Sequence, residues 1–286
     1  QIKAWKGEIT KNKKNGIAWT NYYMAARALR HGSYQNPEMR QKYDDLCHAI
    51  VADVKKSYPG SFESYYLAYI EQGVTGPADN LLKAAEINPN DERLFGEMVI
   101  HHTLTFNQPE FERYCKEVFK ANEFSTGILN WGYNILSELD ENAVLFTCGD
   151  NDTYGTWIIQ AVKNFRKDVT VINTSLMMID DYRNRLFKNL GYAPLEIKTA
   201  ETEEDYDANT NRIYTHFFSG KRPVYVSATA ISYFEKEFGN KLYVTGLAYK
   251  YSESEFDNMS IIRRNYEKRY LLDYLKQIFA YNISDL

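Results

Sequence analysis

The sequence has few cysteines, little net charge and no long apolar run, and each shortage excludes a class of protein. Three cysteines in 286 residues allow at most one disulfide, and their spacing fits no zinc-binding pattern. A net charge of −4 argues against a general nucleic-acid binder. No apolar run approaches the roughly 20 residues that cross a bilayer. We therefore expect a globular chain with no nucleic-acid partner and no membrane span.

The sequence also lacks any complete set of catalytic residues. It has no Walker motif and no glycine-rich dinucleotide loop. The five histidines show no metal-ligand spacing. Ser175 and Ser227 lie outside any Gly-x-Ser-x-Gly elbow and have no recognisable His or Asp partner. These shortages favour a non-catalytic protein, with no cofactor apart from the divalent cation considered below.

Residues 1–140 have the helical spacing of apolar side chains, broken by short turns of Gly, Pro, Asn and Asp. Loops this short make neighbouring helices antiparallel. We interpret the five lysines of the first fourteen residues as a solvated basic arm. The pattern predicts helices over 16–30, from Pro37 to the break at Pro59-Gly60, and over 61–72, 77–88, 91–105, 108–121 and 124–138.

A weak internal repeat with an offset of about 34 residues, the tetratricopeptide period, runs through this helical half. It places Asn88 on Asn122, and residues 82–91 resemble the end of a tetratricopeptide second helix. We therefore predict a tetratricopeptide-like domain over 1–140. Such stacks often bind a peptide or protein partner, and a stack that only scaffolds the second domain stays an equal alternative.

From residue 141 the pattern changes to an α/β domain that continues to residue 286. Strands and helices alternate, which predicts a parallel βαβ core. We expect the acidic stretch 199–210 to be a surface loop. A long amphipathic helix is expected over 257–280, with Tyr274 and Ile278 among its docking residues. The predicted strands are 143–147, 169–173, 223–227 and 241–245, and the predicted helices between them are 156–165 and 180–190.

A polar motif directly follows the first predicted strand, where ligands bind in open α/β sheets. Asp150 and Asp152 could hold a divalent cation, grip a metal-bound diphosphate, or supply an aspartyl nucleophile. Thr174 and Ser175 follow the second strand, where a phosphate-binding hydroxyl would lie. The residues that would bind a metal or ligand are Asp150, Asn151, Asp152, Thr153, Thr174 and Ser175.

A structural role accounts for the same motif. Asp and Asn side chains bond back to neighbouring backbone N–H groups in turns. Asp152 or Thr153 would also serve as the N-cap of the predicted helix over 156–165. Since caps are common, we favour the turn-and-cap interpretation over metal chemistry.

Several segments together carry a family resemblance. They are residues 144–147, the Gly149-Asp150-Asn151-Asp152-Thr153 run, residues 168–176, Arg222-Pro223-Val224-Tyr225 and Gly246-Leu247-Ala248-Tyr249. Residues 142–250 resemble the soluble carboxyl-terminal region of large bacterial envelope membrane proteins related to the animal protein O-mannosyltransferases, a domain of unknown function.

The resemblance implies a location on the periplasmic side of a Gram-negative envelope, with a signal peptide removed before Gln1. It does not imply transferase activity, because that chemistry is expected in a membrane portion that is not part of this sequence.

We therefore expect a non-catalytic periplasmic interaction or accessory module whose helical stack binds a protein partner. One alternative is a metal-dependent enzyme that acts on sugars or phosphates through Asp150 and Asp152. A pocket beside the end of the first strand, lined by Thr174, Ser175 and a basic residue such as Lys221 or Arg222, would favour it. The other alternative is a carbohydrate-binding module, which would require a groove with exposed Tyr or Trp rings.

Overall fold

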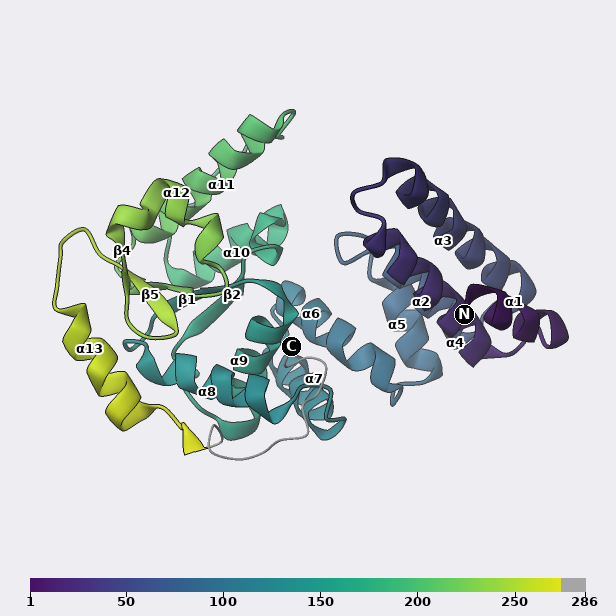
Figure 1. Ribbon diagram of the computed structural model, residues 1–286, viewed down its shortest axis with the longest axis horizontal. Helices are drawn as coiled ribbons and strands as arrows, with labels where there is room; N and C mark the ends of the chain where they lie inside the picture. Colours follow the sequence, from purple (N-terminus) through teal and green to yellow (C-terminus); the bar gives the residue numbers. More distant parts are fainter. Residues whose placement is uncertain (274–286) are drawn as a thin grey trace. The chain divides into compact units, whose positions relative to one another are not determined.

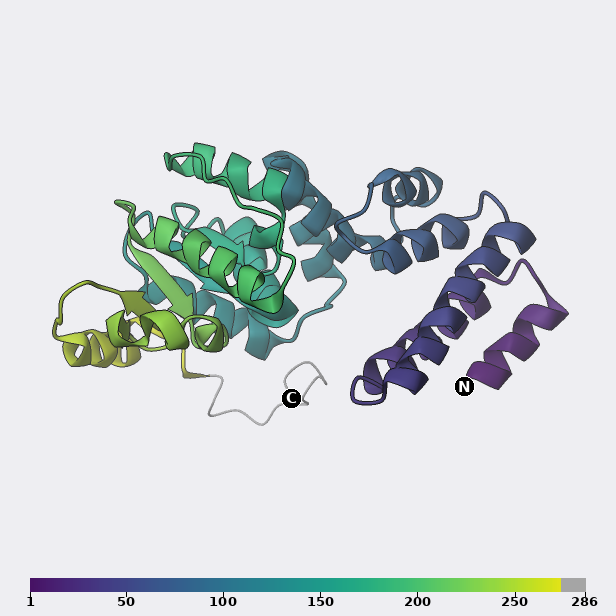
Figure 2. The ribbon, with the colours of Figure 1, turned by 90° about the horizontal axis from the view of Figure 1, so that it is seen from above.

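The computed structural model describes residues 1–273, and it confirms an all-helical first part followed by a mixed sheet with helices between its parallel strands. The chain divides into two compact units, Gln1–Thr103 and a second unit that starts at Leu104 (Figures 1 and 2). No helix within the described residues is both long enough and apolar enough to span a bilayer.

The first unit is made of helical hairpins. Helices start at Asn15, Asn36 and Ser61, whose side chains each accept a backbone N–H three residues further on, as N-caps do. The predicted helices are present within a few residues. The elements are α1 (Ile2–Lys11), α2 (Gly16–Gly32), α3 (Pro37–Ser57), α4 (Phe62–Gln72), α5 (Asp79–Ile87), the 3₁₀ turn η1 (Glu92–Leu94) and α6 (Phe95–Thr105).

The five lysines of the predicted basic arm are exposed, as expected, but residues 2–11 form the helix α1 and not an arm. Ile2, Trp5 and Ile9 recur at helical spacing, and Ile9 is buried while Lys3, Lys6 and Lys11 are exposed. The lysine content of this segment therefore marked the exposed side of a helix.

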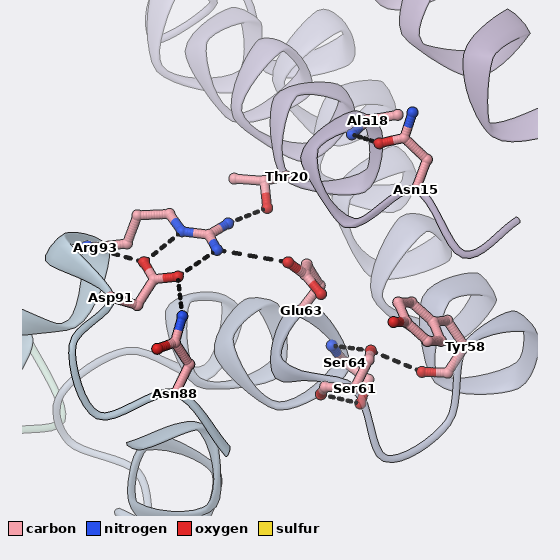
Figure 3. A network of polar contacts seen from close by, with 10 residues as sticks. All are labelled: Asn15, Ala18, Thr20, Tyr58, Ser61, Glu63, Ser64, Asn88, Asp91 and Arg93. Carbon is pink, nitrogen blue, oxygen red and sulfur yellow. Dashed lines mark hydrogen bonds and ion pairs between the residues drawn. The ribbon is translucent and has the colours of Figure 1, made fainter. Parts of the chain in front are cut away.

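Arg93 joins three segments of the helical unit (Figure 3). Its guanidinium donates to Asp91 Oδ1 at 2.7 Å from Nε and to Thr20 Oγ1 at 2.8 Å from Nη1. The same group lies over the Phe62 ring, 4.5 Å from the centroid, and 3.5 Å from Glu63. Arg93 thus connects η1 to α2 and α4, with bidentate geometry that lysine lacks.

The second unit has one five-stranded sheet in the order β2-β1-β3-β5-β4. β1 is parallel to β2 and β3, and β5 is antiparallel to β3 and β4. The carboxyl ends of β1, β2 and β3 therefore meet at one edge, which we call the carboxyl edge. The strands are β1 (Val144–Thr147), β2 (Thr170–Asn173), β3 (Val224–Ser227), β4 (Leu242–Val244) and β5 (Ala248–Tyr251).

Helices cover both faces of this sheet, with α8 and α9 on one side and α10, α11 and α12 on the other (Figure 1). Phe146 of β1 packs against Phe217 and Tyr214 on the second side. The helical elements are α7 (Gln108–Lys120), α8 (Thr126–Glu138), α9 (Gly149–Lys163), η2 (Leu176–Met178), α10 (Asp180–Leu190), α11 (Glu203–Phe218), η3 (Ile231–Tyr233), α12 (Glu235–Phe238), η4 (Gly239–Lys241), α13 (Asn258–Arg264) and the π turn η5 (Asn265–Arg269).

The division between the two units lies earlier than the predicted boundary at 140/141. Helices α7 and α8 are part of the all-helical stretch of sequence, but they pack against α9 and so belong with the sheet. Phe111 of α7 meets Trp157 of α9 edge to face, 5.6 Å between ring centroids.

Three further predictions in the second unit need correction. The helix predicted over 156–165 begins seven residues earlier, at Gly149. The expected surface loop 199–210 lies largely within α11, which opens with a capping box of Thr202 and Asp205. The expected helix over 257–280 ends in the π turn, and Tyr270 is extended. Of its docking residues, Tyr274 and Ile278 lie outside the described part of the chain.

Candidate functional site

The polar motif after β1 forms the first turn of α9. Cys148 is the N-cap residue, and Gly149 has φ +75°, a conformation that favours glycine. Asp150 and Asp152 therefore both lie on the helix. Residues two apart on a helix point about 200° from each other, so they do not share a face. Asp150 is exposed, whereas Asp152 is only 4% exposed.

Asp152 connects the start of α9 to the end of β3. Its Oδ2 accepts the Cys148 backbone N–H at 2.8 Å and the Ser227 hydroxyl at 3.0 Å, and the Thr229 hydroxyl also donates to it. The expectation that Ser227 has no acid partner is thus wrong. So is the expected N-cap role of Asp152 or Thr153, because the helix starts before them. Asp152 instead reaches back to the N–H of the true N-cap residue.

Burial raises the pKa of the Asp152 carboxyl, and the hydrogen bonds from Thr229, Cys148 and Ser227 oppose that rise. The three donors all converge on Oδ2. Oδ1 is buried and has no hydrogen-bond partner among the residues that the structure describes. Divalent cations such as Ca²⁺ need several oxygen ligands, and Asp150 cannot supply one here because it lies on the other side of the helix.

Thr153 and Asn173 hold the first two parallel strands together at the carboxyl edge. The Thr153 and Thr147 hydroxyl oxygens lie 2.8 Å apart, and Asn173 Nδ2 donates to Thr153 Oγ1 at 3.0 Å. Asn173 Oδ1 accepts the Ser175 backbone N–H at 2.9 Å. Asn173 was not predicted as a site residue, although Asn is a common turn residue at such a position.

The structure separates the six predicted site residues into three groups. Asp150 and Asn151 are exposed on the first turn of α9, and Asp152 and Thr153 are buried in the hydrogen bonds described above. Thr174 and Ser175, which follow β2, line a cavity instead.

That cavity, the strand-edge pocket, lies at the carboxyl edge and has a volume of about 270 Å³. The walls come from the segments after β2 and β3 and from α11 and α12. The sequence did not predict most of this lining, because the first part of α11 was taken for a surface loop. The other wall comes from the segment after β3, which is separated from α11 in the sequence. Its lining residues are Thr174, Ser175, Met178, Tyr206, Asp207, Thr210, Asn211, Tyr214, Ser232, Tyr233, Lys236 and Glu237.

A different group of side chains, in the helical unit, has the composition of a metal site. Within the described chain, ligand atoms of Asp44, His48 and Glu71 lie within 4.8 Å of one another. However, Arg30 Nη1 is 3.0 Å from both Asp44 Oδ1 and Glu71 Oε1. The guanidinium already supplies the positive charge for these two carboxylates, so the group is an ion-pair network.

A comparison with protein families gives one match. The family model described as TMEM260-associated domain 2 matches residues 128–221, which run from α8 to just past α11. This part of the chain is therefore similar to a domain associated with TMEM260, which is related to O-mannosyltransferase-like proteins. No curated protein and no solved structure matches the chain.

Proposed function

We propose that this chain is a non-catalytic accessory module of a cell envelope, whose α/β unit recognises a ligand and whose helical unit binds a protein partner. The observation that carries the proposal is that the Asp150 and Asp152 side chains point to different sides of α9. A catalytic metal would need both carboxylates on one side, and Asp152 is engaged by three donors from α9 and β3.

Two features of the helical unit support a protein partner. Its hairpins resemble the stacked pairs of tetratricopeptide proteins, which commonly bind peptides or proteins on an open face. Large apolar side chains are also exposed, among them Ile17 and Tyr34. The periplasmic location is part of the same proposal and rests on the family resemblance of residues 142–250.

The enzyme alternative expected a basic residue such as Lys221 or Arg222 in its pocket, and the pocket has Lys236 instead. Thr174 and Ser175 do line a pocket, but Lys221 and Arg222 do not. Arg222 donates to Thr170 Oγ1 at 3.2 Å, at the amino end of β2 and so at the opposite edge of the sheet. The single lysine of the pocket, Lys236, is accompanied by two acids, Asp207 and Glu237. This balance disfavours a phosphate substrate.

Titration calorimetry with Mg²⁺, Mn²⁺ and Ca²⁺ tests the proposal. We expect no micromolar binding to the wild type, and none to an Asp150→Asn/Asp152→Asn variant, because the two carboxylates cannot reach one ion. Micromolar binding that the double substitution abolishes would contradict the proposal and favour the enzyme. An Asp44→Asn variant is the control. Binding heat that disappears only in this variant comes from the ion-pair network of Arg30.

A further inference from the structure

The strand-edge pocket has the size of a small-ligand site. Pockets for drug-sized ligands enclose roughly 300–1,000 Å³, and the 270 Å³ here suits a smaller molecule. The pocket also has the usual location of ligand sites in α/β folds, beyond the carboxyl ends of parallel strands. Its two sides come from α11 and from the segment after β3 that includes η3 and α12.

Two exposed tyrosine rings stand at this pocket. Tyr206 is 50% exposed and Tyr233 is 54% exposed, whereas Tyr214 is buried beneath them. The Cys148 side chain, just after β1, is the main cause that raises the pKa of the Tyr233 hydroxyl. An aromatic ring with a polar tip offers an apolar face and a hydroxyl to the same ligand.

The charges of the lining disfavour an anionic ligand. Asp207 and Glu237 outnumber Lys236, so a phosphate group would meet net repulsion. A cation would be attracted by the two carboxylates and repelled by the ammonium group of Lys236. A neutral ligand rich in hydroxyl groups suits both signs, since carboxylates accept from hydroxyls and an ammonium group donates to them.

Thr174 supplies a buried hydrogen-bonding group in the wall. This residue is 4% exposed, and its Oγ1 has no hydrogen-bond partner in the structure. Buried hydroxyls are nearly always paired, so an unpaired one in a pocket wall needs an explanation. Because Oγ1 is itself covered, the Thr174 side chain would have to rotate toward the pocket for a ligand hydroxyl to provide the partner.

We propose that the strand-edge pocket binds one or two rings of a neutral carbohydrate, with Tyr206 and Tyr233 against the ring faces and Thr174 bonded to a ring hydroxyl. The carbohydrate alternative required exposed tyrosine or tryptophan rings in a groove, and these two residues meet that requirement. The inference deepens the proposed function, because it names the ligand class of the α/β unit.

The test is an NMR titration of the full chain with glucose, mannose, galactose, N-acetylglucosamine and maltose, with choline and inorganic phosphate for comparison. We expect saturable, millimolar binding of at least one sugar, with shifts at the Thr174, Tyr206 and Tyr233 amides. Tyr206→Ala and Tyr233→Ala should each weaken it at least tenfold. Tyr266→Ala removes a tyrosine that is 47% exposed in the same unit and does not line the pocket, and this control should leave binding unchanged.

Three results would overturn the inference: no saturable binding of any sugar, binding that survives both tyrosine substitutions, or tighter binding of choline or phosphate. Failure of the proposed function would look different. Hydrolysis of a bound sugar that depends on Asp150 or Asp152 would support the pocket but contradict a non-catalytic module.

Discussion

At the scale of single residues, Glu138 is a carboxyl group buried beneath the turn between β4 and β5. Its Oε2 accepts the Leu247 N–H at 3.0 Å and the Tyr270 hydroxyl, and its Oε1 lies 3.3 Å from Thr245 Oγ1. A side chain at Gly246 would collide with both Glu138 and the Tyr270 hydroxyl. Glu138 therefore joins the end of α8 to the turn and to the segment after η5.

Burial raises the pKa of Glu138 to about 7. The folded state then holds a proton that the unfolded state releases near pH 4.5, so stability falls as the pH rises from about 4.5 to 7 and changes no further above that. The shift corresponds to about 3 kcal/mol.

We predict that Glu138→Gln, which mimics the neutral form, removes this pH dependence. Urea unfolding between pH 4.5 and 8 should show the stability of the wild type falling by about 3 kcal/mol relative to the variant. The other titrating groups cancel in this difference. Parallel pH profiles for the two proteins would contradict the assignment.

At the scale of elements, α8 and α9 approach each other through two glycines. A Cβ on Gly132 would lie 2.5 Å from the carbonyl carbon of Gly155, and a Cβ on Gly155 would lie 3.0 Å from Ile128 O. Backbone atoms cannot move aside as a flexible side chain can, so these helices are this close only because both positions lack side chains.

Gly132→Ala should therefore destabilise the α/β unit by roughly 1–3 kcal/mol, despite the higher helix propensity of alanine. Gly7→Ala is the matched control, because Gly7 is also inside a helix and a Cβ there meets nothing within 4 Å. That substitution should stabilise its unit by about 0.5–1 kcal/mol. The midpoints of urea unfolding measure both stability changes. Changes of the same sign in the two variants would contradict the close approach of α8 and α9 at Gly132.

The elements that sequence reasoning predicted well are those whose signals are local. Asn15, Asn36 and Ser61 cap helices, and runs of apolar residues mark β1 to β4. It failed for the start of α9, because Gly-Asp-Asn-Asp-Thr is typical of turns. Asp152 is held in the helix by the backbone N–H of Cys148, just after β1, and by Ser227 of β3, which is distant in sequence.

The candidate site was predictable only in part for the same reason. Strand-end positions identified Thr174 and Ser175 as pocket residues, because strand order alone places them at the carboxyl edge. Tyr206 was missed although the Thr202 and Asp205 capping box was a local signal for α11. Tyr233 had no local signal, since only the folded sheet brings it to α11.

At the scale of the whole molecule, the two compact units have separate cores and need separate probes. Trp19 is buried in the helical unit and Trp157 in the α/β unit. A chain with two such units need not unfold in one step, so one midpoint is not a stability for the whole protein. Each substitution proposed above should be assigned to the transition of its own unit.

The central claim is that the acidic motif is a structural connection and that its two acids have different roles. The Cys148 backbone N–H reports on it directly, because it donates to Asp152 Oδ2 at 2.8 Å. Hydrogen exchange of this amide is therefore the measurement to make in the wild type, Asp152→Ala and the matched Asp150→Ala.

Loss of a hydrogen bond to a charged group costs roughly 1.5–3 kcal/mol. We therefore predict that Asp152→Ala speeds exchange of the Cys148 amide by a factor on the order of 10 to 100, while Asp150→Ala leaves it nearly unchanged. Unaltered exchange in Asp152→Ala, or equal acceleration in both variants, would contradict the account.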